Sequence, residues 1–590
     1  MNNRREFIFK TAASLLTASL GNPVYLLGDT CSEPSVSIFI YLRGGADGLD
    51  MFQLVDEPRN SSLIDFLRNG RPNDQQSRQF ARSELILPRS LTPQNPFCSQ
   101  EVIPVTPTSQ FGFHPAWERL RNFETVDPQL KPSRIKCDRF SSGHALDDFL
   151  IFRVMKGVGM LHFYPDIENV SLNDTRSNKS HFDTQAMSLL ASVSAATGGR
   201  GFLGRAVYFG EPCNGNENLT NRLRLVGFGR YTNSELGGDS CRDVIRITGS
   251  LREFSMHEPI THLGFPETGC RSYRETHNPL VIDWGQNASE LRSLISSLRS
   301  HRNNELAQMI IRAYEIAREA DAVFHSMDNN TNLTIGTETD AEVRARFARY
   351  YYEFRDGVWQ IRQSWNPTAQ LFMNVCRFIL SSDPSVANVN KMVAISLGGY
   401  DTHANQLRDL PRLISELAGG LHGLLYTIRA KKPCLFKKLS IYIMSEFGRT
   451  IRANAGLSTD HGWASVLLAI FGSYAPIPRE QRLDRELGPE FILTSSPTHR
   501  DSIRQSSARM YARDLSRLHI DLDPMHLYPK VSMHSALALI LSKALSIAEG
   551  NLATFFDTIM ERKFYSKNYI AYENQRRLWT EFLEGIPGWS

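Results

Sequence analysis

The sequence predicts an α/β fold with a doubly wound, mostly parallel sheet and irregular insertions. Three apolar runs, residues 35–42 (SVSIFIYL), 391–397 (KMVAISL) and 439–444 (LSIYIM), are continuous and end in polar loops. Continuous apolar runs of this length are typical of strands buried on both faces of a parallel sheet. Stretches with helical spacing separate them, and this alternation of strand, loop and helix indicates an α/β architecture.

Further elements follow from the same patterns. Residues 151–160 (IFRVMKGVGM) predict another core strand, and His114 is expected to be a packed, hydrogen-bonded loop residue. The aromatic cluster at Tyr350, Tyr351 and Tyr352 is expected to pack within a helix. Helices are expected over residues 183–196, 288–327, 341–380, 410–428 and 532–548.

The length of 590 residues, 41% of them hydrophobic, provides for a large core. At about 150 residues per domain the length alone would allow about four domains, but large α/β enzymes with insertions often form one. We therefore expect a single domain over residues 31–590, with insertions near 55–110, 209–280 and 475–525. These ranges are rich in Pro, Asn, Ser, Gly or Arg and show little periodicity.

Charge and cysteine content narrow the function classes. Lysine and arginine number 66 against 62 acidic residues, a net charge of +4, and no block of like charge indicates a nucleic-acid partner. The 8 cysteines contain no CxxC pair. If the chain is exported, disulfides can form among Cys98, Cys137, Cys213, Cys241 and Cys270, and the sequence leaves their pairing open.

The amino terminus predicts export. Arg4 and Arg5 precede Phe7 and a mildly apolar stretch, TAASLLTASLG, so that residues 1–30 resemble a twin-arginine signal. The alternative is a basic amphipathic first helix. The expected partner is the twin-arginine translocase and the expected location is the periplasm or cell envelope. No A-x-A cleavage site follows, so this segment can remain as an anchor, and no later run reaches the roughly 18–20 apolar residues of a membrane span.

Ligand-type side chains follow the predicted strands. They are Asp47 and Asp50 in RGGADGLD, Asp401 and His403 in GGYDTHANQ, Glu446 and Arg449 in SEFGRT, and Asp460 and His461 in TDHG. Carboxylate oxygens and imidazole nitrogens converging from several strand ends suit a zinc or manganese site. Taken alone, Asp401 and His403 fit a loop-capping aspartate and a hydrogen-bonded histidine equally well. Together with Asp460 and His461 they predict a shared polar site.

These motifs carry a family resemblance. LRGGADGLD, SHFDTQ, GFLGRA, LGGYDTHANQ, SEFGRT and TDHG occur in this order and resemble the domain of unknown function 1501 family of exported bacterial proteins. That family is similar to the alkaline phosphatase and sulfatase superfamily, whose members bind two metals on an α/β sheet beside a hydroxyl nucleophile. The resemblance implies an alkaline-phosphatase-like fold and a metal-dependent hydrolase.

The resemblance also implies metal ligands. Asp47 resembles the first-strand metal aspartate, and Asp401 with His403 resembles the middle metal loop. Glu446 stands where relatives place an Asp-His pair, with Phe447 in the histidine place. Asp460 and His461 replace the missing ligand from the next loop. The expected metal is zinc, with manganese or calcium as alternatives, and the number of ions stays open.

Catalytic residues are expected nearby. Ser180, beside His181, is the candidate nucleophile, although a serine at this point is also a good helix N-cap. His181 is expected to bind metal or to hydrogen-bond the site. Arg449 and Arg43 are candidates for gripping a small anionic ester, and the alternative for each is a salt bridge to a neighbouring carboxylate. The sequence thus predicts an exported metal-dependent hydrolase of phosphate or sulfate esters. The alternative is a non-catalytic cell-envelope binding or assembly protein that retains the fold.

Overall fold

The structure is a computed structural model, and its chain divides into two compact units, Met1–Glu33 and Pro34–Ser590. The expected signal segment, residues 1–30, lies outside the described residues. The structure describes residues 33–55, 58, 61–69, 102–106, 108–121, 146–159, 188–189, 201–210, 219–229, 245–258, 280–285, 288–301, 303–356, 358–462, 465–473, 475–477, 481, 483–487, 531–559 and 581–586.

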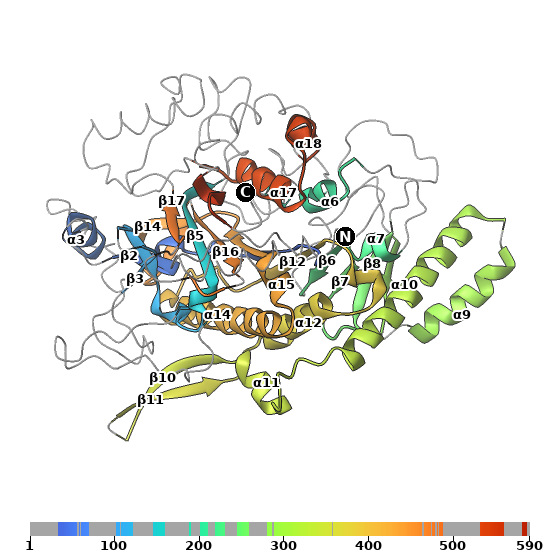
Figure 1. Cartoon of the computed structure of the whole chain (residues 1–590), viewed down its shortest axis with the longest axis horizontal. Coiled ribbons are helices and arrows are strands. Elements are labelled where there is room, and N and C mark those ends of the chain that lie inside the picture. Colours follow the sequence, from blue (N-terminus) through green and yellow to red (C-terminus); the bar gives the residue numbers. More distant parts are fainter. Residues whose placement is uncertain are drawn as a thin grey trace, which may run out of the picture. The chain divides into compact units, whose positions relative to one another are not determined.

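A large sheet organises this unit, and its centre is parallel (Figure 1). Strand β1 (Val36–Leu42) lies between β12 (Lys391–Leu397) and β13 (Leu439–Ser445), and both pairings are parallel. Next to β12 come β6 (Leu225–Phe228) and then β7 (Ile245–Ile247), again in parallel. The expected mixed α/β class with a mostly parallel central sheet is therefore confirmed.

Antiparallel strands extend the sheet at both edges. Beyond β13, β16 (Ser465–Gly472) and then β5 (Leu150–Gly159) pair antiparallel. The short strands that complete the edges are β17 (Arg485–Leu487) and β18 (Val531–Ser532) on β5, and β8 (Phe254–Glu258) and β9 (Leu280–Asp283) beyond β7.

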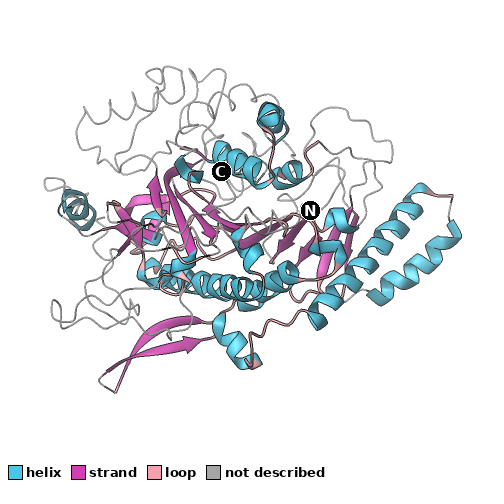
Figure 2. Ribbon diagram, in the orientation of Figure 1, coloured by secondary structure: helices cyan, strands magenta, loops and turns pink. Residues whose placement is uncertain are grey.

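Helices lie on both sides of the sheet (Figure 2), and a hydrophobic core is packed against each face. One core packs α12 (Ala369–Leu380) and α14 (Gln406–Lys431) on the sheet, and the other packs α6 (Phe202–Val207), α17 (Met533–Ala544) and α18 (Leu552–Ile559). Ile38 and Ile40 of β1 enter the first core, whereas Phe39 and Tyr41 enter the second. This burial on both faces explains why the strand is apolar throughout.

The remaining elements surround this framework. Near the first strand, β2 (Phe52–Leu54), β4 (Phe111–Phe113) and β3 (Ile103–Pro104) form a separate antiparallel sheet. The remaining helices are α2 (Gly48–Met51), α3 (Ser61–Asn69), η2 (Pro115–Trp117), η3 (Asp147–Phe149), α7 (Leu219–Arg222), α9 (Ala288–Leu298), η7 (Arg299–His301), α10 (Glu305–Asn330), α11 (Asp340–Arg346), α13 (Pro384–Ala387), α15 (Pro433–Lys437) and η10 (Glu549–Asn551).

The structure differs from the expected helix over residues 341–380. After α11 the chain forms a hairpin of β10 (Arg349–Arg355) and β11 (Val358–Ser364), and only then begins α12. The prediction of a helix-packed tyrosine cluster is therefore wrong, because Tyr350–Tyr352 belong to a strand. Aromatic residues favour strands, and the positive φ of 53° at Asp356 is typical of two-residue hairpin turns.

The expected insertions also contain parts of the sheet. Strands β6 and β7 fall within residues 209–280 and are integral to the parallel centre, and β17 falls within 475–525 and pairs with β5. These strands have only 3 or 4 residues. Such short strands between glycine- and arginine-rich stretches leave too few positions for a periodic signal.

A buried acid provides a test of the packing around η2. Both carboxylate oxygens of Glu118 lack a hydrogen-bond partner among the described residues, and burial raises its pKa to about 8, opposed by Arg119. Because this folded-state pKa exceeds the unfolded one, the contribution to stability is full below pH 4.5 and is lost as the pH rises towards 8.

We expect Glu118→Gln to abolish this loss. The unfolding free energy of the variant minus that of the wild type should increase by about 3 kcal/mol between pH 5 and pH 8, at about 1.36 kcal/mol per pKa unit. Urea titrations at both pH values measure it. Glu319→Gln, at an exposed position of α10, is the control and should show no such change. A pH-independent difference for Glu118→Gln would contradict the expected protonation.

Candidate functional site

Three central strands end at the same level and deliver their loops to one edge of the sheet. Leu42 of β1 lies opposite Leu397 of β12 and Ser445 of β13. The three loops that follow contain most of the predicted ligands. The third continues into a hairpin of β14 (Arg449–Ala453) and β15 (Thr459–His461). Carboxyl ends of parallel strands are where open α/β sheets place their ligand sites.

Asp401, His403 and His461 come together at this edge, and we call them the triad. Their ligand atoms lie within 4.8 Å of one another, the one such group of histidine, cysteine and acidic side chains among the described residues. The Nε2 atom of His403 lies 2.8 Å from Nε2 of His461 and 3.0 Å from Oδ1 of Asp401. The Nε2 atom of His461 lies 3.6 Å from the same oxygen.

Asp460 and Asn454 position His403 from the side of the residue that faces away from the other triad atoms. The Nδ1 atom of His403 lies 3.2 Å from Asp460 Oδ1, and Asn454 Nδ2 donates to both this oxygen (3.0 Å) and the His403 carbonyl (3.1 Å). Burial alone would raise the pKa of Asp460, but hydrogen bonds from Asn454 and His403 lower it. A carboxylate on the far nitrogen of a histidine is the arrangement that orients metal-binding imidazoles.

Phe447 supports the other histidine. Its ring centroid lies 4.7 Å from that of His461, which in turn lies 4.6 Å from that of His403. Phe447 is buried and also contacts Gly45, where a methyl group would lie 2.1 Å from the phenyl ring. In the place of the expected family histidine, this phenylalanine therefore packs against a triad residue.

Arg449 ties the loops together beneath the triad. Its Nη2 atom donates to Asp401 Oδ1 at 2.6 Å, and Nη1 donates to the Thr459 carbonyl at 3.0 Å. Its other bonds are to the carbonyls of Gly44, Gly45 and Tyr400, and Nη1 also lies 3.4 Å from His403 Nε2. The guanidinium is fully buried, so it forms the salt bridge expected as its alternative role, with all three nitrogens bound to protein atoms.

Asp47 and Asp50 lie in a second, closed cluster. Asp47 is the N-cap of α2 and its side chain accepts from Leu49 N at 3.0 Å. The Gln406 amide bridges the two carboxylates, donating to Asp47 at 2.8 Å and also to Asp50, and Thr459 Oγ1 donates to Asp47 at 3.1 Å. Both acids are buried, and neither belongs to the triad.

Glu446 closes the first loop. Its buried carboxylate accepts from Gly44 N at 2.7 Å and from Ser445 Oγ at 3.1 Å, and it is not part of the triad. Burial raises the pKa of Tyr41 well above its usual value, and Glu446 raises it further. The hydrogen bond with Ser188 and the charge of Arg43 both lower the pKa of Tyr41, against these larger effects.

Of the remaining predicted residues, Ser180 and His181 cannot be placed, whereas His114 can. Ser180 and His181 lie outside the described residues, although Ser188, further along the same predicted helix, hydrogen-bonds Tyr41 at 2.6 Å. The expectation for His114 is confirmed. It is buried and its Nδ1 accepts from Ala116 N at 3.0 Å, and burial lowers its pKa to about 3.

The absence of a side chain at Gly44 allows the loop after β1 to lie close against the loop after β12. Its φ is +117°, and a methyl group there would lie 2.2 Å from Asp401 N. We expect Gly44→Ala to lower the unfolding free energy by at least about 2 kcal/mol more than Gly336→Ala. Gly336 also has a positive φ, +62°, but nothing lies within 4 Å, so its substitution tests the backbone cost alone. Equal losses in urea titrations would contradict the close approach.

Fold and site together define a mixed α/β protein with a cluster of nitrogen and oxygen ligands at the strand ends of a mostly parallel sheet. The model of the family described as "Protein of unknown function (DUF1501)" matches residues 285–472. This match supports the resemblance to that family, and it spans the triad and Arg449. No curated protein and no solved structure matches the chain. Among the described residues, no helix combines the length and hydrophobicity needed to cross a membrane.

Proposed function

We propose that this protein is an exported, metal-dependent hydrolase of phosphate or sulfate esters, and that Asp401, His403 and His461 hold one divalent ion. The mutual approach of their three ligand atoms, all within 4.8 Å, is the observation that carries the proposal. Two imidazole nitrogens with one carboxylate oxygen fit zinc best, and manganese less well. The Arg449 charge, already paired with Asp401, disfavours a second ion beside the first.

Each surrounding residue has a defined part in this proposal. When bound, such a metal polarises an ester oxygen and lowers the pKa of a coordinated hydroxyl or water. Asp460 orients His403, Arg449 positions Asp401, and Phe447 packs against His461. The side chains of Asp401 and His403 are 44% and 43% exposed, so an ester can approach from solvent. Ser180 and His181 remain the proposed nucleophile and its partner.

Export is part of the same proposal. The twin-arginine-like segment supports it, and so does Cys434, which is disulfide-bonded, whereas Cys376 is a buried free thiol. Disulfides persist outside the cytosol and are rare within it. The proposed location is the periplasm or cell envelope.

A screen of esters tests the activity. Phosphomonoesters, phosphodiesters and sulfate esters are offered to the protein with zinc, manganese or calcium. We expect hydrolysis of one class, loss of that activity with a chelator, and loss in Ser180→Ala. If no class is hydrolysed with any of these metals, the hydrolase proposal is wrong.

One observation favours the alternative of a non-catalytic binding protein. All three nitrogens of the Arg449 guanidinium are bound to protein atoms, so this arginine, which lies next to the triad, has little capacity to bind an anionic ester. Metal bound at the triad without turnover of any ester would support this alternative. The same screen, combined with metal analysis, therefore separates the two functions.

A further inference from the structure

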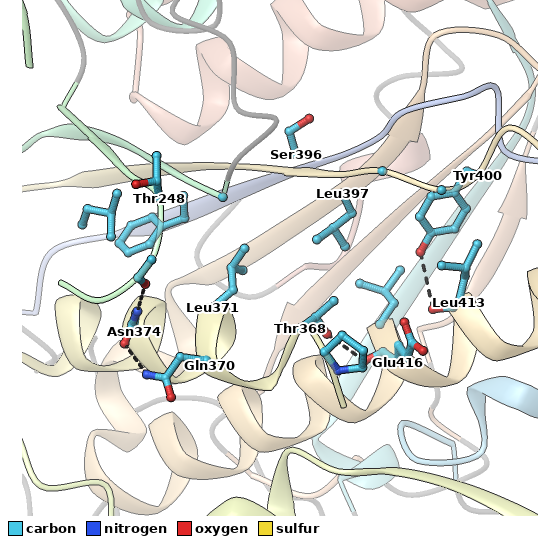
Figure 3. A pocket seen from close by; sticks show the side chains of 18 of the residues that line it. Thr248, Thr368, Gln370, Leu371, Asn374, Ser396, Leu397, Tyr400, Leu413 and Glu416 are labelled. Atoms are coloured by element: carbon cyan, nitrogen blue, oxygen red, sulfur yellow. Dashed lines mark hydrogen bonds between the residues drawn. The ribbon is translucent and has the colours of Figure 1, made fainter. Parts of the chain in front are cut away.

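A pocket of about 520 Å³ lies at the carboxyl ends of β6, β7 and β12, on the side of the sheet covered by α12 and α14 (Figure 3). Leu397 points from the end of β12 towards the helices, and Leu371 points from α12 towards the strand. We call this space the strand-end pocket. Its volume falls in the range of small-molecule sites.

The strand-end pocket adjoins the triad along the chain. Gly398, Gly399 and Tyr400 line it, and the next residue is Asp401. The φ of +97° at Gly399 turns the chain at this point. The Tyr400 hydroxyl donates to the Leu413 carbonyl on the pocket side, while the Tyr400 carbonyl accepts from Arg449 on the triad side. One short loop thus borders both the pocket and the triad.

The charges of the pocket wall are already compensated. Glu416 is buried, and its Oε1 accepts from Arg349 Nη1 at 3.0 Å and from Arg412 Nη1 at 2.9 Å. The acid is therefore paired with two guanidinium groups. With Arg412 bound to Glu416, the described residues of the wall include no unpaired cation that would select an anionic group.

The rest of the wall combines neutral polar groups with apolar side chains. Gln370 and Asn374 contribute amides, with Gln370 Nε2 donating to Asn374 Oδ1 at 2.9 Å and Asn374 Nδ2 to the Gly249 carbonyl at 2.8 Å. Thr248 and Thr368 contribute hydroxyls, which donate to protein oxygens and whose own oxygens can accept from a ligand. The apolar part includes Leu371. Neutral donors and acceptors on an apolar floor suit a ligand that is uncharged and carries several hydroxyl groups.

We infer that the strand-end pocket binds the uncharged, hydroxyl-bearing organic part of the substrate, a sugar or cyclic polyol, while the ester group reaches the triad. This inference rests on the proposed function. It names the substrate class as phosphate or sulfate esters of polyhydroxylated alcohols.

Binding of the neutral part alone tests the inference without any turnover. The probes are methyl α-D-glucopyranoside and myo-inositol, titrated into the full chain by calorimetry or ligand-observed NMR. We expect at least one of them to bind, and Leu371→Trp, which fills the pocket, to weaken that binding at least tenfold. Gln370→Ala, at an exposed position, should weaken it at least threefold.

Two controls separate this inference from the proposed function. Leu294→Trp places the same ring on an exposed position of α9 and should bind the probe like the wild type. His403→Ala should also bind it normally, because the triad does not line the pocket. The inference is overturned if neither probe binds, or if Leu371→Trp and Gln370→Ala leave the affinity unchanged. Failure of ester hydrolysis or of metal binding would leave this measurement unaffected.

Discussion

Replacing Arg449 by methionine is expected to lower the free energy of unfolding by about 3–5 kcal/mol. The guanidinium is fully buried and bonds to four main-chain carbonyls and the Asp401 carboxylate, which come from three separate loops. Methionine retains much of the volume but removes all of these donors. The Tyr400 carbonyl keeps a bond from Thr402 N at 2.9 Å, but buried acceptors that lose their donor are costly. Urea denaturation followed by circular dichroism measures the loss.

An exposed arginine provides the control for this substitution. The Arg408 side chain is 71% exposed and pairs with its neighbour Asp409 at 3.1 Å. Surface ion pairs contribute about 0–1 kcal/mol, so Arg408→Met should change the stability little. A loss at Arg449 no larger than at Arg408 would show that Arg449 does not hold the three loops together.

His403→Ala is expected to reduce the affinity for zinc at least a hundredfold. His403 is the one residue of the triad within 3.0 Å of both other ligand atoms, so its removal leaves only two ligands. Competition with a chromophoric chelator measures the affinity. Because the His403 side chain is 43% exposed, we expect the fold to persist, and the same urea titration verifies this.

A histidine elsewhere serves as the matched control. His325 is exposed on α10 and contacts Asn329, with 2.9 Å between His325 Nε2 and Asn329 Nδ2. His325→Ala should therefore bind zinc as the wild type does. If His403→Ala keeps the wild-type affinity, then the triad is not the zinc site.

The sequence predicts the long strands of the main sheet well, and the short strands and the separate β10–β11 hairpin poorly. The runs at residues 35–42, 391–397 and 439–444 each form the expected strand, because burial on both faces requires an apolar side chain at nearly every position. The hairpin of β10 and β11 was not expected. There the local preference of the aromatic residues for strands outweighs a pattern that resembles helical spacing.

The candidate site, too, could be predicted from the sequence only in part. Strand-end loops indicate which residues gather at the sheet edge, and Asp401, His403, Asp460 and His461 do so. Sequence spacing does not show which way each side chain points, so Asp47 was expected among the ligands although it caps α2. The start of that helix at Gly48, directly after an aspartate, is a capping signal that could have indicated this.

Three contributors to the site have no sequence signal of their own. Asn454, Gln406 and Phe447 acquire their roles only through contacts with residues far away in the chain. Asn454 lies in a turn where asparagine is common for local reasons, and Gln406 begins a long helix. Phe447 occupies a place where the resemblance implies a histidine, and only the packing against His461 shows what it does instead.

Anomalous diffraction at the zinc edge, from crystals of the full chain grown with zinc, tests the central claim most directly. We expect one strong peak about 2.0–2.2 Å from Asp401 Oδ1, His403 Nε2 and His461 Nε2. A peak on the Asp47 and Asp50 carboxylates instead, or no peak at the triad in a crystal that contains zinc, would contradict the assignment of the triad as the metal site.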